Sequence, residues 1–297
     1  MGTDYWKLGI IGWPLGYSLS PAMHRAALEA SGLRGEYQEY PVRPEELEKW
    51  LESAIKLGLN GFNVTMPHKE AVFQWLTSWG KIEREMDQIT GAINTVKVSG
   101  RRLIGYNTDG DGFLRALTDP PRSIDLKGKK VLLLGAGGAA QAVAVQLAYQ
   151  GKVGQITIWN RHPERAVRLA EKVNRLRSSH TRCQAVGVEE LDKGLLETVD
   201  LLVNATPVGM EGKKDETLLP VEVKQLRKDA VVYDLVYAPP KTALIRSAQR
   251  RGNPAITGLE MLANQAAVAF HLWTENHGKP VISVMRQVLS EHLSARA

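Results

Sequence analysis

The first part of the chain alternates short apolar runs with segments in which apolar residues recur every three or four positions. The runs favour strands, and the segments between them are typical of amphipathic helices. These helical segments begin near Pro21, Pro44 and Pro67, and proline suits the first turn of a helix. Such alternation predicts a mostly parallel α/β sheet. The predicted strands are residues 8–11, 36–40, 61–64, 93–98 and 103–106.

A break in this pattern follows at residues 118–123, where Pro120 and Pro121 stand together. Paired prolines end a helix and do not fit a central strand. Beyond the break, the apolar run at residues 130–134 predicts the buried first strand of a second α/β unit. Further strands are predicted at 156–159, 201–204 and 231–235, followed by a long amphipathic helix at 259–275 and a last helix from Pro280.

The length of the chain supports a division into domains. One hydrophobic core rarely serves 297 residues, so two domains are expected. We expect an N-terminal α/β domain over residues 1–118 and a second α/β domain over residues 119–257. The C-terminal helices, residues 258–297, are expected to pack back on the first domain.

Composition excludes several classes of protein. No apolar run approaches the ~20 residues of a membrane span, and the N-terminus lacks the basic, apolar and small-residue regions of a signal peptide. Cys183 is the single cysteine, which excludes an internal disulfide and a cysteine-based metal site. No cluster of residues with metal-ligand spacing is apparent, so no metal is expected. The expected compartment is a reducing one, the cytoplasm.

The net charge of +6 raises the question of a nucleic-acid partner. The basic residues are scattered, however, and aromatic side chains do not alternate with them as on nucleic-acid-binding surfaces. A basic chain also attracts small anions through long-range electrostatics. We therefore expect a small anionic ligand, no nucleic acid and no membrane partner, with the chain a monomer or a homodimer.

A glycine-rich loop follows the first strand of the second domain. Residues 131–140 read VLLLGAGGAA, which is a strand, a G-x-G-x-x-A motif and the start of an alanine-rich helix. In this motif Gly135 permits the tight turn, Gly137 lets a pyrophosphate approach the backbone, and Ala140 lets helix and strand pack closely. A turn that serves packing alone is the alternative, which the surrounding strand and helix disfavour. The loop predicts a Rossmann-type, doubly wound parallel sheet that binds a dinucleotide.

The next predicted strand indicates which dinucleotide binds. An NAD enzyme places an acidic residue near the end of this strand for the ribose 2′-hydroxyl, but here the strand ends in Trp159, Asn160 and Arg161. Arg161 and Arg165 are suited to bind a 2′-phosphate through charge-assisted hydrogen bonds. If the two arginines are only solvated surface residues, this preference disappears. The pattern favours NADP(H) over NAD.

Polar side chains gather in the turns of the first domain. Residues 16–21 put Ser18 and Ser20 before a helix, where hydroxyl and N–H groups can hold a carboxylate, although Ser20 also suits ordinary helix capping. Residues 61–69 run from a buried strand through Thr65 to Lys69, a position at which most lysines are simply solvated. The carboxyl ends of parallel strands are where α/β sheets bind ligands, so these turns are candidates for a binding site.

Three further polar positions have equally plausible structural explanations. Asn94 and Asp109 lie in two later turns, and Asp109 also suits the N-cap of a helix predicted at residues 111–117. Gln265 lies in the mostly apolar C-terminal helix, where a buried glutamine needs hydrogen-bond partners whether or not it contacts a ligand.

Taken together, nine segments in order resemble the shikimate dehydrogenase family (shikimate 5-dehydrogenases) along nearly the entire chain. The resemblance implies an NADP-dependent oxidoreductase that interconverts 3-dehydroshikimate and shikimate in the chorismate pathway to the aromatic amino acids. It also implies that the first domain binds substrate and the second binds NADP. The segments are GWPLGYSLSPAMH (12–24), GFNVTMPHK (61–69), GAINT (91–95), GYNTDGDG (105–112), GAGGAA (135–140), NR (160–161), NATPVGM (204–210), DLVYAPPKT (234–242) and GLEMLANQA (258–266).

The resemblance also implies roles for individual residues. Lys69 and Asp109 match the catalytic pair, which faces the ring hydroxyls of the substrate, and Ser18 and Ser20 match the contacts to its carboxylate. Further substrate contacts are implied for Thr65, Asn94, Tyr237 and Gln265. The implied cofactor contacts are Gly135, Ala136, Gly137, Gly138, Ala139, Asn160, Arg161, Arg165, Thr206, Leu235 and Gly258.

One departure from the family pattern affects an implied contact, and two rival functions are left open. His162 stands where NADP-using members often have threonine, which puts one phosphate hydrogen bond in question. A quinate/shikimate dehydrogenase with broader substrate or NAD use is the nearest alternative. A sensor that binds the cofactor without turnover is the other, and retention of both Lys69 and Asp109 speaks against it.

Overall fold

The computed structural model describes residues 5–16, 18–176, 180–211, 219–275 and 281–294. The chain divides into two compact units. Unit 1 is Met1–Gly112 together with Ala263–Ala297, and unit 2 is Phe113–Leu262. The segment from Ala263 onward therefore belongs to the same unit as the N-terminal segment.

Unit 1 is built on a six-stranded sheet in the order β2-β1-β3-β5-β6-β4. The sheet is parallel except for β5, which is antiparallel to β3 and β6. Strand order reverses between β1 and β3, and open α/β sheets bind ligands beyond the carboxyl ends of strands at such a point. The strands are β1 Trp6–Gly12, β2 Gly35–Pro41, β3 Gly61–Val64, β4 Lys81–Ile82, β5 Thr95–Ser99 and β6 Arg102–Tyr106.

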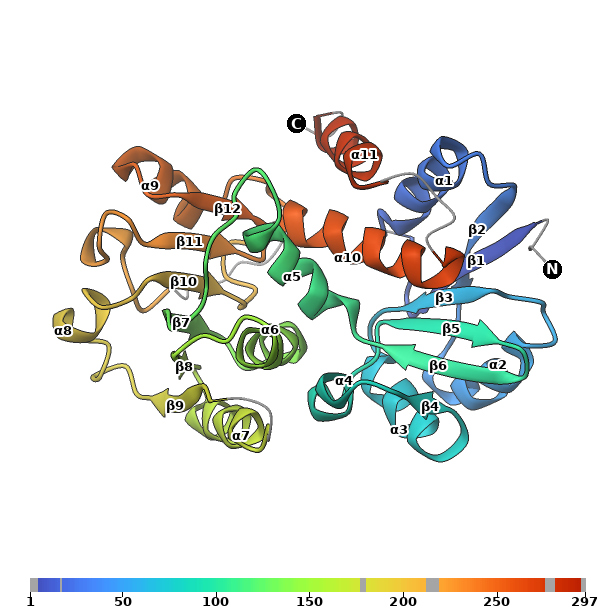
Figure 1. Ribbon diagram of the computed structural model, residues 1–297, viewed down its shortest axis with the longest axis horizontal. Helices are drawn as coiled ribbons and strands as arrows, with labels where there is room; N and C mark the ends of the chain where they lie inside the picture. Colours follow the sequence, from blue (N-terminus) through green and yellow to red (C-terminus); the bar gives the residue numbers. More distant parts are fainter. Residues whose placement is uncertain (1–4, 17, 177–179, 212–218, 276–280, 295–297) are drawn as a thin grey trace. The chain divides into compact units, whose positions relative to one another are not determined.

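Helices cover both faces of this sheet (Figure 1). Leu51 of α2 and Leu76 of α3 belong to the apolar cluster around Phe62 on one face. On the other face α1 contacts β1, β2 and α11, and Trp273 of α10 packs against Gly61 of β3. The helices with residues in this unit are α1 Ser20–Ala30, η1 Pro44–Glu46, α2 Leu47–Ala54, α3 Lys69–Trp79, α4 Glu85–Thr90, α5 Thr108–Thr118, α10 Gly258–Thr274 and α11 Ile282–Ser294.

Unit 2 contains a second six-stranded sheet, in the order β12-β11-β10-β7-β8-β9, with every pairing parallel. Read from β9, this is the 3-2-1-4-5-6 order of a Rossmann sheet, with its switch point between β7 and β10. The predicted doubly wound fold is confirmed. Its elements are β7 Lys130–Leu134, α6 Gly138–Tyr149, β8 Gln155–Trp159, α7 Pro163–Asn174, β9 Arg182–Val186, α8 Lys193–Leu196, β10 Leu201–Asn204, η2 Val223–Gln225, β11 Val231–Asp234, α9 Ala243–Arg251 and β12 Ala255–Thr257.

Some boundaries differ from the sequence-based expectation. α3 begins at Lys69 and not at Pro67, because residues 65–68 first form a turn in which the His68 N–H donates to the Thr65 carbonyl. The strands β4, β9 and β12 were not predicted, and β5 begins later than expected. Pro280, the expected start of the last helix, lies outside the described residues.

A buried histidine lies among aromatic rings on one face of unit 1. His24 of α1 is stacked on Tyr37 with ring centroids 4.6 Å apart, and Trp273 lies 5.1 Å away. Within the described part of the chain, neither ring nitrogen meets a hydrogen-bond partner of good geometry. Burial lowers the pKa of His24 to about 3, against the weaker effect of the Asn63 side chain. The ring is therefore neutral throughout the physiological range.

This pKa predicts a loss of stability in acid. Between its ordinary pKa of 6.5 and about 3, His24 is protonated in the unfolded chain and neutral in the fold. The unfolded state thus binds more protons, and the free energy of unfolding falls by up to about 1.4 kcal/mol per pH unit as the pH drops through this window. His24→Phe keeps an aromatic ring without titrating. Urea unfolding from pH 6.5 to 4.5 should give a shallower pH dependence for this variant, and equal slopes would contradict the assignment.

Candidate active site

An ion pair joins two of the predicted site residues of unit 1. The Lys69 Nζ lies 2.7 Å from the Asp109 Oδ2, and the side chains are 31% and 16% exposed. Lys69 is the first residue of α3, and the buried His68 before it lies with its Nε2 2.7 Å from the Val42 carbonyl oxygen, which fixes the start of that helix. The lysine is therefore held in place by the fold and its ion pair.

Asp109 is not the helix cap that its position suggested. α5 begins at Thr108, so Asp109 lies inside its first turn, and the Asn107 side chain caps the helix by accepting from the Asp109 and Gly110 N–H groups. The carboxylate of Asp109 is thus available for other partners. Ser20 likewise is not a cap, because it is the first residue of α1 and its N–H donates to the Ser18 Oγ at 3.2 Å.

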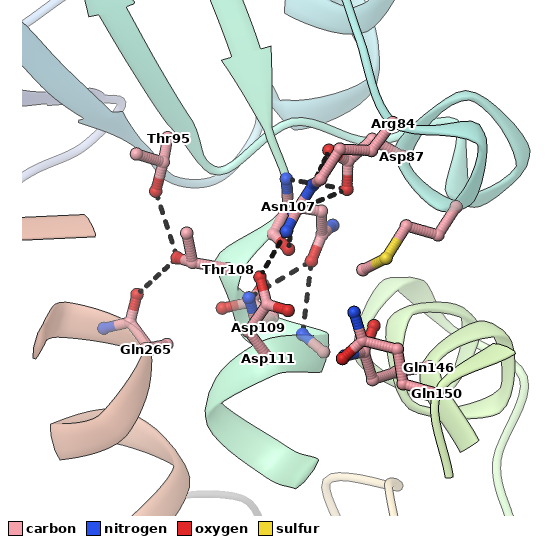
Figure 2. Close-up of polar contacts among 12 residues, drawn as sticks. Arg84, Asp87, Thr95, Asn107, Thr108, Asp109, Asp111, Gln146, Gln150 and Gln265 are labelled. Carbon is pink, nitrogen blue, oxygen red and sulfur yellow. Dashed lines mark hydrogen bonds and ion pairs between the residues drawn. The ribbon is translucent and has the colours of Figure 1, made fainter. Parts of the chain in front are cut away.

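The buried amide of Asn94 holds the second oxygen of this carboxylate. Its Nδ2 donates to the Asp109 Oδ1 at 2.8 Å, and its Oδ1 accepts from the Thr108 N–H at 2.7 Å. The Gln265 Oε1 lies 3.4 Å from both the Asn94 Nδ2 and the Thr108 Oγ1, as Figure 2 shows for Thr108. The structure therefore brings Lys69, Asp109, Asn94 and Gln265 into one hydrogen-bonded cluster.

The approach of α10 to this cluster depends on a glycine. A Cβ atom added at Gly112 of α5 would lie 2.5 Å from the Gln265 backbone nitrogen. Real Cβ contacts are longer than this, so any larger residue would separate the two helices at this point. The missing side chain lets Gln265 reach Thr108 and Asn94.

The other predicted substrate residues lie in the loops that follow β1 and β3. Ser18 and Ser20 come from the β1–α1 loop and the first turn of α1. Thr65 follows β3 directly, and its N–H donates to the Ile11 carbonyl of β1 at 2.9 Å. These loops leave the carboxyl ends of neighbouring strands, the edge at which Asp109 also follows β6. Tyr237 belongs to unit 2, where it is 37% exposed.

Several polar residues that complete the cluster were not predicted. The Tyr37 hydroxyl donates to the Asn63 Oδ1 at 2.7 Å, and the Asn63 Nδ2 donates to the Thr95 Oγ1 at 3.1 Å. Thr95 in turn lies 3.1 Å from the Thr108 Oγ1. A polar Asn63 within the otherwise apolar strand β3 was a signal for such a network, because a buried amide needs partners.

In unit 2, a cavity of about 390 Å³ lies at the carboxyl ends of β7, β8 and β10. Seven of the eleven predicted cofactor residues line it. Trp159, His162 and Leu219 also contribute to its wall. The predicted residues in the wall are Gly135, Ala136, Gly137, Asn160, Arg161, Arg165 and Thr206.

This cavity fits a dinucleotide. Gly135 has a φ of +113°, which favours glycine, and an added Cβ would lie 2.9 Å from the Ala205 carbonyl oxygen. At Gly137 and Gly138 an added Cβ would meet nothing within 4 Å, so the backbone before α6 is open to a ligand. The N-terminus of α6 has no side-chain cap, and its N–H groups suit a pyrophosphate.

Two arginines give one end of the cavity a positive charge. Arg161 and Arg165 are exposed, and within the described ranges neither has an ion-pair partner. Unpaired guanidinium groups at the end of β8 suit a 2′-phosphate, and the described wall of the cavity contains no carboxylate that would bind a 2′-hydroxyl instead.

The remaining predicted cofactor residues do not line the cavity. Gly138 and Ala139 form the exposed first turn of α6, beside its open N-terminus. Leu235 and Gly258 follow β11 and β12, and an added Cβ at Gly258 would collide with the Leu235 carbonyl oxygen. Close contact between the start of α10 and the segment after β11 explains the glycine without a ligand, so a cofactor role for Leu235 and Gly258 stays a prediction.

The described residues offer no candidate for a metal site or for a membrane-spanning helix. No three His, Cys, Asp or Glu side chains in that part of the chain group in a way that suits a metal ion. None of the helices described is both long and apolar enough to cross a bilayer.

Taken together, the fold and these two sites define an α/β protein with a Rossmann-type dinucleotide unit and a second unit that carries a lysine–aspartate pair. Three family models match the chain. "Shikimate dehydrogenase substrate binding domain" matches residues 10–96, "Shikimate / quinate 5-dehydrogenase" residues 120–228, and "Shikimate 5'-dehydrogenase C-terminal domain" residues 258–289. The chain belongs to the shikimate dehydrogenase family, which confirms the resemblance noted in the sequence.

Individual relatives extend along nearly the whole chain. A shikimate dehydrogenase (NADP(+)) from Methanopyrus kandleri is 43% identical over 286 residues, covering 96% of this chain and 95% of the relative. The shikimate 5-dehydrogenase of Thermus thermophilus, solved with NADP(H) and shikimate, has a TM-score of 0.80 and 37% identity over 96% of this chain and 99% of that one. A quinate dehydrogenase from Corynebacterium glutamicum with NAD has a TM-score of 0.84 and 30% identity, covering 97% and 100%.

The contact at Gly112 predicts an effect on stability. Gly112→Ala should lower the free energy of unfolding by about 1–3 kcal/mol, the usual range for overpacking, because the added methyl group collides with the Gln265 backbone. Gly138→Ala is the matched control, since it also lies in a helix but has open space around it. Urea denaturation should show Gly138→Ala at least as stable as the parent. A Gly112→Ala midpoint equal to that of the control would contradict the close approach.

Proposed function

We propose that this protein is a shikimate dehydrogenase, an oxidoreductase that catalyses the reversible NADP-dependent reduction of 3-dehydroshikimate to shikimate in the chorismate pathway to aromatic amino acids. The observation that carries the proposal is the 2.7 Å contact between Lys69 and Asp109 in a chain of this family. It supplies the two groups that proton transfer at a ring hydroxyl requires.

Lys69 and Asp109 handle the proton. Oxidation of a secondary alcohol removes the hydroxyl proton, and a lysine Nζ beside the hydroxyl can take or relay it. Among the described residues, Asp109 is the hydrogen-bond partner of that Nζ. The other N–H groups of the ammonium can therefore point to the substrate. Because Asn94 holds the other carboxylate oxygen, Asp109 keeps Lys69 in one position while the proton moves. When bound, NADP would supply the acceptor for the hydride.

The remaining residues orient the substrate and the cofactor. Ser18 and Ser20 bind the ring carboxylate, and Thr65, Asn94, Tyr237 and Gln265 are further substrate contacts. The loop from Gly135 to Ala139 binds the pyrophosphate, and Asn160, Arg161 and Arg165 bind the adenosine phosphate, with Thr206, Leu235 and Gly258 as further contacts. The NADP(H) and shikimate in the Thermus thermophilus relative support the same pair of ligands here.

The rival functions have less support. The unpaired Arg161 and Arg165 in the cavity wall favour NADP, although a relative in this family is a quinate dehydrogenase solved with NAD. An intact lysine–aspartate pair has no purpose in a sensor that does not turn over substrate.

An activity assay separates the three candidate functions. The protein is mixed with shikimate or quinate and with NADP or NAD, and reduction of the nicotinamide is followed by its absorbance. The proposal also retains the expectations of a cytoplasmic location and a monomer or homodimer.

Loss of the lysine should remove turnover without affecting the cofactor. Lys69→Ala is expected to lower kcat by ~100-fold or more, because proton transfer and orientation depend on the Nζ. The KM for NADP should change little. Lys97→Ala is the matched control, since the Lys97 Nζ also pairs with a carboxylate, that of Glu275, at 2.8 Å in unit 1. Near-normal turnover of Lys69→Ala would remove Lys69 from its catalytic role.

Loss of the arginines should reduce NADP recognition selectively. Arg161→Ala and Arg165→Ala each remove a charged hydrogen-bond donor worth about 1.5–3 kcal/mol, so the KM for NADP should rise by roughly 10-fold or more. The KM for NAD, which has no 2′-phosphate, should stay within about 2-fold. Arg168→Ala, an exposed arginine of α7 that does not line the cavity, is the control. Equal changes for NADP and NAD would show that the arginines do not bind the 2′-phosphate.

A further inference from the structure

A second cluster of charges lies beside the lysine–aspartate pair and takes no part in the chemistry proposed above. Arg84 lies just before α4, with its side chain 28% exposed. Its Nε and Nη2 donate to the two oxygens of Asp87, at 2.6 and 2.9 Å, and its Nη1 donates to Asp111 at 2.8 Å. Figure 2 shows these groups gathered around Asn107. One guanidinium therefore joins α4 to the segment that begins α5.

Arg84 and Asp87 also bind the carbonyl and N–H groups of the Asn107 backbone. Arg84 Nη2 donates to the Asn107 carbonyl oxygen at 3.0 Å, and Asp87 Oδ1 accepts from the Asn107 N–H at 3.1 Å. The Asn107 side chain then accepts from the N–H groups of Asp109 and Gly110, at 3.1 and 3.4 Å. Its Nδ2 donates to the Ala92 carbonyl oxygen. Every polar group of Asn107 is therefore used to fix the start of α5.

The hydrogen bonds from Arg84 and Asp87 to the Asn107 backbone, called the clamp below, determine the position of Asp109. Asp109 is two residues beyond Asn107, in the first turn of α5, and its carboxylate must meet Lys69 and Asn94 at 2.7 and 2.8 Å at the same time. No hydrogen bond joins Arg84 to Lys69 or Asp109 within the described residues. Arg84 thus acts on the catalytic pair through the backbone of Asn107.

We propose that Arg84 and Asp87 are positioning residues of the active site, which hold the Asn107 backbone so that Asp109 stays in register with Lys69. The inference rests on the proposed function of that pair. A displacement of about 1 Å in a catalytic group can lower turnover by ~100-fold, so a clamp of this kind affects rate far more than cofactor binding.

The chemistry of the cluster requires an arginine. The planar guanidinium makes two parallel bonds to Asp87 and still reaches Asp111 and a carbonyl, whereas a lysine ammonium lacks this fork. Burial raises the pKa of Asp87 to about 6, with the bonds from Arg84 opposing the shift. Burial also acts to lower the pKa of Arg84, but Asp87 and Asp111 together raise it. Breaking the pair would leave a buried carboxylate without its cation, so Arg84→Lys is the informative variant.

A double-mutant cycle separates positioning from a purely structural role. Arg84→Lys is measured alone and in an Asp109→Asn background, with kcat and the KM for NADP determined for each protein. We expect Arg84→Lys to lower kcat by ~10-fold alone and by less than ~2-fold when Asp109 is already altered, because the arginine acts through that carboxylate. The KM for NADP should stay unchanged in all four proteins. A structural contact alone would give the same factor in both backgrounds, and that result would overturn the proposal.

Arg122→Lys is the matched control for this cycle. The Arg122 side chain is also 28% exposed, and its Nη1 bonds to a backbone carbonyl and, at 3.5 Å, to Glu260 in unit 2. Its substitution should leave kcat within ~2-fold of the parent, since it has no link to Asp109. A loss equal to that of Arg84→Lys would show a general effect of removing a partly buried guanidinium.

Hydrogen exchange tests the clamp without relying on the reaction. In the absence of ligands, Arg84→Lys should speed exchange of the Asp109 and Gly110 amides by ~10-fold or more, because both depend on the fixed Asn107 side chain. Arg122→Lys should leave them unchanged. Unchanged exchange in Arg84→Lys would overturn the clamp even if shikimate is turned over. If the parent protein does not turn over shikimate, the proposed function fails, while faster exchange still supports the clamp.

Discussion

The candidate site of unit 1 depends on one side-chain amide that has to satisfy two sets of partners at once. Asn94 donates to Asp109 and accepts from the Thr108 N–H, at 2.8 and 2.7 Å, and it does so in a nearly water-free environment. A buried amide that lost either partner would be left with an unsatisfied polar atom, at a cost of about 1–3 kcal/mol. The geometry of the lysine–aspartate pair is therefore maintained by the requirement that its neighbours remain hydrogen-bonded.

The candidate cofactor site in unit 2 differs, because several of its polar groups have no hydrogen-bond or ion-pair partner among the described residues. The N-terminus of α6 has no side-chain cap, Gly137 and Gly138 leave open space there, and Arg161 and Arg165 have no carboxylate partner among the described residues. Groups of this kind are costly to leave unpaired unless water or a ligand satisfies them. The carboxylate of Asp109 and the amide of Asn94 in unit 1 thus bond to protein groups, whereas the cavity in unit 2 leaves polar groups open to an anion.

Apolar runs made much of the fold predictable from the sequence. The strands at residues 61–64, 130–134 and 201–204 were predicted with their observed limits, because each has a single polar residue in a short apolar run. β9 and β12 were missed, since β9 mixes polar with apolar residues and β12 has only three residues. In the site, the resemblance to the family indicated Lys69 and Asp109, but Arg84 and Asp87 resembled an ordinary helix ion pair. Only the folded chain shows that they reach Asn107, because periodicity contains no information on contacts between distant segments.

The antiparallel strand β5 has a consequence for how this protein can vary. β5 and β6 pair as a hairpin, with Thr95 opposite Tyr106 at one end and Ser99 opposite Arg102 at the other. Asn94 and Asp109 therefore both lie at the open end, and the turn at Gly100 lies at the far end of the hairpin. Loops of different length or sequence can be accepted at that turn over evolution without moving the polar groups of the site. A deletion inside either strand would instead reverse which face its side chains occupy.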